Sequence, residues 1–145
     1  MAQQVRFLLM GVGNVGRRFL ELVINKGDTL RDRLGLELLP VGVADSSGAA
    51  LSPNGLDAEQ LLQLKRQGLG VASYPGWGQP GCSALEMVQS TRADLLLEAS
   101  PASMEDGQPG LSCIETALEK GMHVVTANKA PLVLAFPRLQ SLAKE

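Results

Sequence analysis

Six residues near the start of the chain have the types and spacing of a phosphate-binding turn: Gly11, Val12, Gly13, Asn14, Val15 and Gly16, the pattern G-x-G-x-x-G. The pattern follows an apolar run over 5–10 and opens a helical pattern over 15–26, a context that favours dinucleotide binding. Gly11 permits a tight turn, Gly13 lets the backbone approach a pyrophosphate, and Gly16 lets the helix pack close to the strand. Unpaired N–H groups of the first helical turn would then face the phosphates. The alternative is a glycine turn that serves packing alone.

An acidic residue ends the second predicted strand, where apolar residues 41–44 run into Asp45. At this place a Rossmann fold holds the adenosine ribose of its cofactor with a carboxylate. The alternative is a turn residue that bonds its own backbone. A 2′-phosphate would be repelled by Asp45, and no arginine or lysine directly follows it, so the sequence predicts that NAD is favoured over NADP. Lys65 is the nearest downstream base, and it could fold back toward the site from another predicted helix.

Two further candidates follow buried strands. Ser100 comes just after the strand predicted at 93–98, and Lys129 comes just after the one predicted at 123–126. Ligands of open α/β sheets gather outside the carboxyl ends of the strands, so we expect both side chains in one crevice. For Lys129 the alternative is an ordinary surface lysine.

The elements that must position these residues alternate between strand and helix along the chain. This order predicts an α/β fold, a Rossmann-type doubly wound parallel sheet with helices on both faces. Further helices are predicted from 57, over 83–90, over 111–121 and over 138–145, with a turn or short helix from Pro131. Asp57 can cap the first of these, with Gln60 three residues on, and Ser83 and Glu86 form a capping-box pattern at the start of the second. Gly27 is expected to stop the first helix. Polar or irregular connections are expected over 28–35, 46–56 and 71–82.

The composition narrows the class of protein. A chain of 145 residues with 45% apolar and 3% aromatic residues predicts one domain with an aliphatic core. The net charge of −2 gives no electrostatic case for nucleic acid or an anionic membrane. We see no signal peptide and no run of transmembrane length. Cys82, Cys113 and His123 lack metal-ligand spacing, so we expect no metal, reduced thiols and a cytoplasmic location.

Four stretches together resemble the cofactor-binding domain of homoserine dehydrogenase, and the resemblance covers essentially the whole chain. They are residues 11–16, 44–48, 97–101 and 123–131, of which the last, with Thr-Ala-Asn-Lys-Ala-Pro, is the most specific. The resemblance implies NAD(P)-dependent interconversion of L-homoserine and L-aspartate 4-semialdehyde. It also implies roles by position. Residues 12–16 would hold the pyrophosphate and Asp45 the adenosine ribose. Ser100 would lie near the nicotinamide ribose, and Lys129 near the nicotinamide and the reacting hydroxyl, helping proton transfer.

The same resemblance implies that residues 1–145 form the NAD(P)-binding domain alone. In the family a further region carries dimer contacts and the homoserine-binding residues, and we expect it to be absent from this chain. We therefore expect a small-molecule substrate, a possible homodimer in the longer enzyme, and no useful turnover by these residues alone. The alternatives are a related amino-acid dehydrogenase, such as aspartate dehydrogenase, and a short non-catalytic dinucleotide-binding module.

Overall fold

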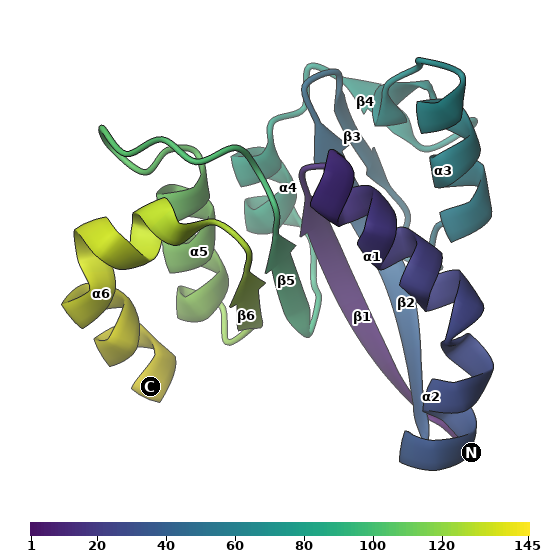
Figure 1. Cartoon of the computed structure of the whole chain (residues 1–145), viewed down its shortest axis with the longest axis horizontal. Coiled ribbons are helices and arrows are strands. Elements are labelled where there is room, and N and C mark those ends of the chain that lie inside the picture. The colour runs from purple at the N-terminus through teal and green to yellow at the C-terminus, as the bar shows by residue number, and fades with distance from the viewer.

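A computed structural model describes all of residues 1–145. Its centre is a six-stranded sheet in the order β4-β3-β2-β1-β5-β6 (Figure 1). The strands are β1 Gln3–Met10, β2 Leu36–Asp45, β3 Gly48–Leu51, β4 Gly78–Pro80, β5 Leu95–Glu98 and β6 His123–Thr126. β2, β1, β5 and β6 are parallel, whereas β3 and β4 add an antiparallel edge beside β2. The predicted α/β fold class is confirmed, with a mixed sheet instead of a purely parallel one.

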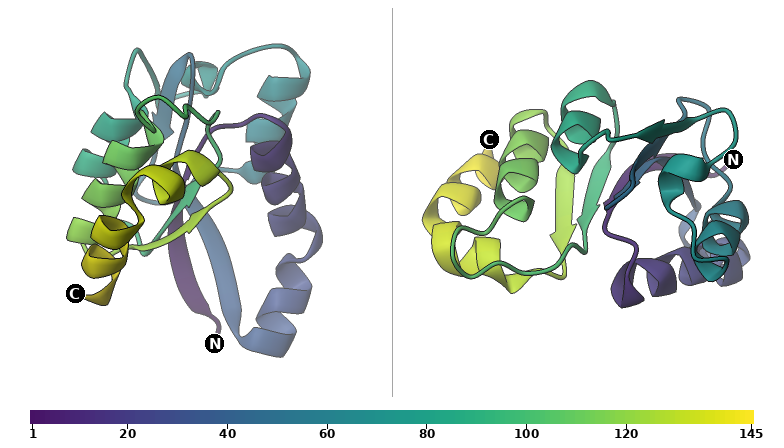
Figure 2. Two further views of the ribbon diagram at one scale, coloured as in Figure 1. Left: turned by 60° about the vertical axis from the view of Figure 1, so that its left-hand side comes forward. Right: turned by 90° about the horizontal axis from the view of Figure 1, so that it is seen from above.

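Six α-helices and one short 3₁₀ helix surround the sheet. They are α1 Asn14–Asn25, α2 Gly27–Leu34, α3 Ala58–Arg66, α4 Ala84–Ser90, α5 Gly110–Glu119, α6 Lys129–Lys144 and the 3₁₀ helix η1 Val71–Ser73. α1 and α3 cover one face of the sheet, and α4 and α5 cover the other (Figure 2). α6 packs against α5 at the end of the molecule opposite α3.

β1 supplies both halves of the core because its successive side chains point to opposite faces. Phe7 and Leu9 pack with α1 and α3, whereas Leu8 and Met10 pack with α4 and α5. All four of these side chains are at most 1% exposed. A strand buried on both faces therefore needs the near-continuous apolar sequence that predicted it.

Three predicted connections are instead regular structure. Residues 27–34 form α2, which buries no residue and therefore shows no apolar stripe in the sequence. The first helix, α1, ends at Asn25 with Lys26 as its C-cap, so it stops next to Gly27 as predicted. The chain then continues directly into α2, which ends at the left-handed Gly35, with φ +64°. β3 and β4 lie inside the two stretches predicted to be irregular, and each is only three or four residues long.

Pro40 lies inside β2, where the sequence predicted that the regular strand starts one residue later. The pairing of β1 with β2 shifts there: Phe7 is opposite Pro40 and Leu8 is opposite Gly42. Val41 is thus the extra residue of a bulge, and a bulge is one of the few places where a sheet tolerates a proline.

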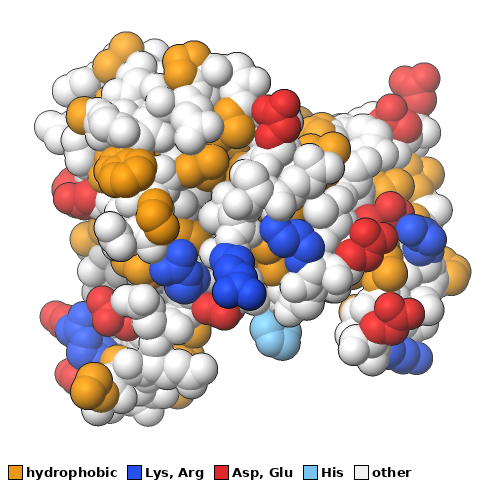
Figure 3. All heavy atoms as spheres, turned by 180° about the vertical axis from the view of Figure 1, so that it is seen from behind, with side chains coloured by type: hydrophobic (Ala, Val, Ile, Leu, Met, Phe, Trp, Pro, Cys, Tyr) orange, Lys and Arg blue, Asp and Glu red, His pale blue; other side chains and the backbone are white.

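The outer surface carries charges of both signs. Seen from behind, blue and red side chains are interspersed with apolar ones (Figure 3). None of the helices combines the length and apolarity that crossing a bilayer requires.

Candidate functional site

The site is built where the chain leaves β1 and β5. After β1 the chain enters α1 on one face of the sheet, and after β5 it runs to α5 on the other face. The two strands are neighbours, so their connections diverge and leave a crevice outside their carboxyl ends. Open α/β sheets bind ligands at this kind of switch point.

The first and third glycines of the predicted turn are needed by the protein's own packing. Gly11 has φ +94°, and a Cβ there would lie 2.5 Å from the carbonyl oxygen of Ala99. A Cβ on Gly16 would lie 2.1 Å from the carbonyl oxygen of Gly11. Both distances are far inside van der Waals contact, so these glycines shape the turn whether or not a ligand binds.

Gly13 differs from both of these. Its φ of −86° lies outside the left-handed region, its ψ is −148°, and no heavy atom lies within 4 Å of the position that its Cβ would occupy. Gly13 is also the N-cap residue of α1, whose start has no side-chain cap and no acidic residue in the first turn. The positive end of the helix dipole and its N–H groups therefore face open space, as an anion site requires.

A cavity of about 820 Å³ lies in front of this turn. Its volume falls in the range of small-molecule and cofactor sites. The lining comes from the ends of β1, β2 and β5, from the start of α4 and from Lys65 of α3. It comprises residues 10–15, 44–46, 48, 65, 81–85, 99–101 and 109. The residues present therefore fit an elongated ligand with a phosphate group at the glycine turn.

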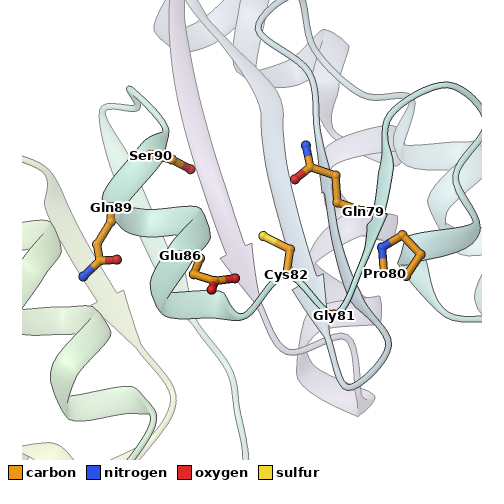
Figure 4. Close-up of a pocket in the computed structure, with 7 residues that line it drawn as sticks. All are labelled: Gln79, Pro80, Gly81, Cys82, Glu86, Gln89 and Ser90. Carbon is orange, nitrogen blue, oxygen red and sulfur yellow. The ribbon is translucent and has the colours of Figure 1, made fainter.

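A second hollow of about 570 Å³ adjoins the first and shares Gly81 and Cys82 with it. Figure 4 shows its polar lining between β4 and α4: Gln79, Pro80, Gly81, Cys82, Glu86, Gln89 and Ser90. Burial and the nearby Glu86 carboxylate raise the pKa of the Cys82 thiol above its ordinary value. This hollow lacks the glycine turn, so the larger cavity is the better candidate site.

Asp45 ends β2 and lines the cavity, as predicted, but its carboxylate already has partners within the protein. Oδ2 accepts hydrogen bonds from Lys65 Nζ at 2.7 Å and from the Val71 N–H at 3.0 Å. Oδ1 accepts from the N–H and the hydroxyl of Ser47. Burial raises the pKa of Asp45, yet these hydrogen bonds lower it by more, so its pKa lies below the ordinary value.

Lys65 corrects the premise of the predicted cofactor preference. That prediction rested on the absence of a base directly after Asp45 and left open whether Lys65 folds back, and Lys65 does fold back from α3 onto the carboxylate. Asp45 is 7% and Lys65 16% exposed, so water screens the pair only partly. Because 20 residues separate the partners, the sequence could name Lys65 as a candidate but could not establish the contact.

Ser100 lines the cavity at the end of β5. Its N–H donates to Glu98 Oε1 at 2.8 Å, and its hydroxyl donates to the same oxygen. Glu98 itself is 1% exposed. Sequence reasoning assigned Glu98 no role, although a carboxylate that ends an otherwise apolar strand was a usable signal.

Lys129 is the first residue of α6, directly after the N-cap Asn128. Its side chain is exposed, forms no ion pair or hydrogen bond, and does not line the cavity. Lys129 follows β6, which is separated from β1 by β5. The catalytic role of Lys129 therefore stays a prediction that rests on the resemblance.

No three metal-ligating side chains cluster anywhere in the molecule. Cys82 and Cys113 are free, and burial followed by the Glu98 charge raises the pKa of Cys113 to about 12.

The doubly wound sheet, the glycine turn and the cavity in front of it are the features of the dinucleotide-binding class of α/β domains. Residues 1–106 match the family described as Glutamate/Leucine/Phenylalanine/Valine dehydrogenase, and the chain belongs to that family. The matched residues include the glycine turn, Asp45 and Ser100, and they end before α5.

Over nearly the whole chain, the similarity is to homoserine dehydrogenases, which confirms the resemblance. The chain is 31% identical over 138 residues to homoserine dehydrogenase of Methanocaldococcus jannaschii, covering 95% of this chain and 40% of that protein. It is 33% identical over 142 residues to NAD(+)-dependent homoserine dehydrogenase of Pseudomonas canavaninivorans, covering 97% and 40%. The chain thus spans about 40% of the length of these curated relatives.

The fold has a close structural counterpart. A hyperthermophilic archaeal homoserine dehydrogenase mutant, solved in complex with NADPH, superposes with a TM-score of 0.82 at 24% identity. The superposition covers 98% of this chain and 41% of that one. At this identity the likeness concerns the fold, and it confirms the doubly wound arrangement.

Proposed function

We propose that this chain is the NAD(P)-binding domain of a homoserine dehydrogenase-like oxidoreductase. The observation that carries the proposal is the open space in front of Gly13, at the uncapped start of α1. Gly11 and Gly16 have packing reasons to be glycine, but Gly13 has none within the protein. A ligand that approaches the backbone at this point supplies the missing reason, and a pyrophosphate fits the uncapped helix start.

The cavity lining supports a place for the cofactor in this proposal, because residues 12–15, Asp45 and Ser100 all line it. We propose that the N–H groups of residues 12–16 bind the pyrophosphate, with Asp45 on the adenosine side and Ser100 toward the nicotinamide ribose. The nicotinamide, when bound, accepts or donates the hydride. The protein's part is to hold the ring in place, and Lys129 is proposed to help the proton transfer at the substrate hydroxyl.

The segment after residue 106 supports the substrate class. The match to the Glutamate/Leucine/Phenylalanine/Valine dehydrogenase family ends at residue 106. The similarity to homoserine dehydrogenases, by contrast, covers 95–97% of this chain. That longer match takes in most of the remaining residues, among which is the Thr126–Pro131 stretch. We therefore favour L-homoserine and L-aspartate 4-semialdehyde as substrate and product over those of another amino-acid dehydrogenase.

The remaining assignments extend from the relatives. Relatives of more than twice this length suggest that the homoserine-binding residues lie in a region that these 145 residues do not cover. We propose that residues 1–145 act as one cofactor-binding unit, that the longer enzyme is a homodimer, and that it works in amino-acid biosynthesis in the cytoplasm. The two free cysteines agree with a reducing compartment.

Two measurements on the 145-residue chain test this proposal. Titration with NADH and with NADPH, followed by cofactor fluorescence, should give saturable binding of at least one of them. Addition of L-homoserine with oxidised cofactor should then give no useful rise in reduced-cofactor absorbance. Failure to bind either dinucleotide would refute the proposal, and rapid homoserine-dependent reduction would refute the assignment of the substrate residues to another region.

A further inference from the structure

Glu98 is a carboxylate that the proposed cofactor chemistry leaves without a role. It ends β5, it is 1% exposed, and it stands among apolar strand residues. A buried charge is costly unless hydrogen bonds compensate for it, so a carboxylate at such a position has a specific task.

One oxygen of Glu98 fixes the backbone and side chain of Ser100. Oε1 accepts from the Ser100 N–H at 2.8 Å and also from its hydroxyl. Together these two bonds hold the turn after β5 and select one position for the Ser100 hydroxyl. Ser100 lines the cavity, and the proposed function assigns it to the nicotinamide side.

The other oxygen of Glu98 fixes the start of α6. Oε2 accepts from the Thr126 hydroxyl at 2.9 Å, and the Thr126 oxygen accepts in turn from the Asn128 N–H at 2.9 Å. The Asn128 side chain then caps α6 by accepting from the Ala130 N–H at 3.1 Å. The chain of bonds from Glu98 thus ends at the helix turn that carries Lys129.

The packing around Glu98 shows that its surroundings are tightly fitted. A Cβ on Gly110 would lie 3.1 Å from Glu98 Oε2 and 3.0 Å from Asn128 Nδ2. Asn128 is 4% exposed, and its Nδ2 is buried without a hydrogen-bond partner. Gly110 is helical with an ordinary backbone, so the space that it leaves is what admits these two polar groups.

We infer that Glu98 is the positioning residue of the nicotinamide end of the site. Its carboxylate joins Ser100 to the Thr126–Asn128 turn, and so sets the cofactor side and the lysine-bearing helix relative to each other. The inference rests on the proposed function, because it assigns Ser100 to the nicotinamide half of a bound dinucleotide. The inference adds Glu98 as a residue that acts on the nicotinamide half only. None of the hydrogen bonds of its carboxylate reaches the N–H groups of the glycine turn or Asp45.

The test compares NAD⁺ with ADP, which carries only the adenosine diphosphate half. Glu98→Leu should weaken NAD⁺ binding by the 145-residue chain about tenfold and leave ADP binding within about twofold, as the loss of one or two oriented hydrogen bonds predicts. Glu98→Gln should rescue NAD⁺ binding to within about threefold of wild type. Its amide oxygen still accepts from Ser100, and the Thr126 hydroxyl can turn to the Asn128 carbonyl 3.2 Å away.

A second variant tests the same cluster without touching its hydrogen-bonding groups. Gly110→Ala places a methyl group against Glu98 and Asn128, and it should also weaken NAD⁺ selectively over ADP. Gly27→Ala is the matched control, because it is also helical and no atom lies within 4 Å of its Cβ position. If Glu98→Leu does not fold, the NAD⁺ and ADP dissociation constants of Gly110→Ala test the positioning role of Glu98. In Gly110→Ala the amide hydrogens of Ser100 and Asn128 should also exchange faster than in wild type.

The outcomes separate the two ideas. Equal weakening of NAD⁺ and ADP with a lower melting temperature, or no change in the ratio of their dissociation constants, would overturn the positioning role while leaving the proposed function intact. A wild-type chain that binds neither ligand would overturn the proposed function, and the positioning role with it.

Discussion

At the scale of single residues, Asp45 and Lys65 form the pair that the proposed function places beside the adenosine ribose. The Lys65 ammonium lies 2.7 Å from Asp45 Oδ2, and both side chains face the cavity. A 2′-phosphate near Asp45 would therefore meet a cation beside the anion. The predicted advantage of NAD(H) over NADP(H) should accordingly be small.

The contribution of Lys65 can be measured directly. Lys65→Met keeps the length of the side chain but removes its charge, so it should weaken NADP(H) binding by about tenfold more than NAD(H) binding. Asp45→Ser should shift the preference the other way, toward NADP(H). Dissociation constants for both cofactors at one low ionic strength check both variants. Equal losses for the two cofactors in Lys65→Met would show that Lys65 does not reach the ribose end.

Asp45 also makes the stability of the domain depend on pH. Its pKa is lowered in the folded protein, so it releases its proton more readily there than in the unfolded chain. The stability that it contributes is complete above the unfolded pKa of about 3.9 and is lost as pH falls through the folded pKa. Urea unfolding of wild type and Asp45→Asn should be compared between about pH 6 and about pH 3. The free energy of unfolding should fall more steeply with acid for wild type than for the variant. Parallel curves would remove Asp45 from the explanation of acid sensitivity.

At the scale of elements, side-chain caps decide where helices begin. In α4 the Ser83 hydroxyl accepts from the Glu86 N–H at 3.1 Å, and the Glu86 carboxylate accepts from the Ser83 N–H at 2.9 Å. This reciprocal capping box was predicted from Ser-x-x-Glu alone, and the structure confirms it. Asp57 likewise caps α3 as predicted.

Loss of this cap should be visible in the stability of the whole domain. Ser83→Ala should lower the free energy of unfolding by about 1 kcal/mol, because the Glu86 N–H at the start of α4 loses the Ser83 hydroxyl as its acceptor. Chemical denaturation measures the change. The control is Ser141→Ala, at an exposed position within α6, which should stay within about 0.5 kcal/mol of wild type. Equal effects of the two substitutions would argue against the capping box.

The elements that the sequence missed are weakly buried or very short: α2 and β4 bury little or nothing, whereas β3 is buried over residues 48–50 but only four residues long. α2 buries nothing and is held by a Gly35 cap and an Asp28–Arg31 ion pair, so it shows no apolar stripe. β4 has three residues and pairs only with β3, which turns back directly after Asp45. By contrast, β1 and α4 carry strong local signals, and both lie where they were predicted.

At the scale of the whole molecule, the order of the strands creates the site. β1 and β5 are adjacent, and the helices after them lie on opposite faces, so the cavity opens between the glycine turn and Ser100. The turn is also tied to both neighbours, since Gly11 N–H donates to the Ala44 carbonyl and Ala99 N–H donates to the Met10 carbonyl. The divergence of the two connections thus leaves the turn facing open space.

Most of the predicted site residues lie at the cavity as the sequence predicted, whereas Lys129 lies outside its lining, and the partners of the site residues did not follow from the sequence. Gly13, Asp45 and Ser100 line the cavity. The sequence could predict this because the ends of strands can be located from local patterns. Lys65 reaches Asp45 only through the packing of α3, and Glu98 meets Thr126 only through the pairing of β5 with β6. Contacts that depend on tertiary packing leave no periodic signal in a single sequence.

The most direct test of the central claim is the dissociation constant of NADH for the wild-type chain and for Gly13→Val. The wild-type chain should bind NADH saturably. Gly13→Val should weaken that binding by about tenfold or more, because a branched side chain would stand in the space that the pyrophosphate needs. Its circular dichroism and melting temperature should stay close to wild type, since no protein atom lies within 4 Å of the Cβ position. A folded Gly13→Val that binds NADH as tightly as wild type would contradict the assignment of this turn as the dinucleotide site.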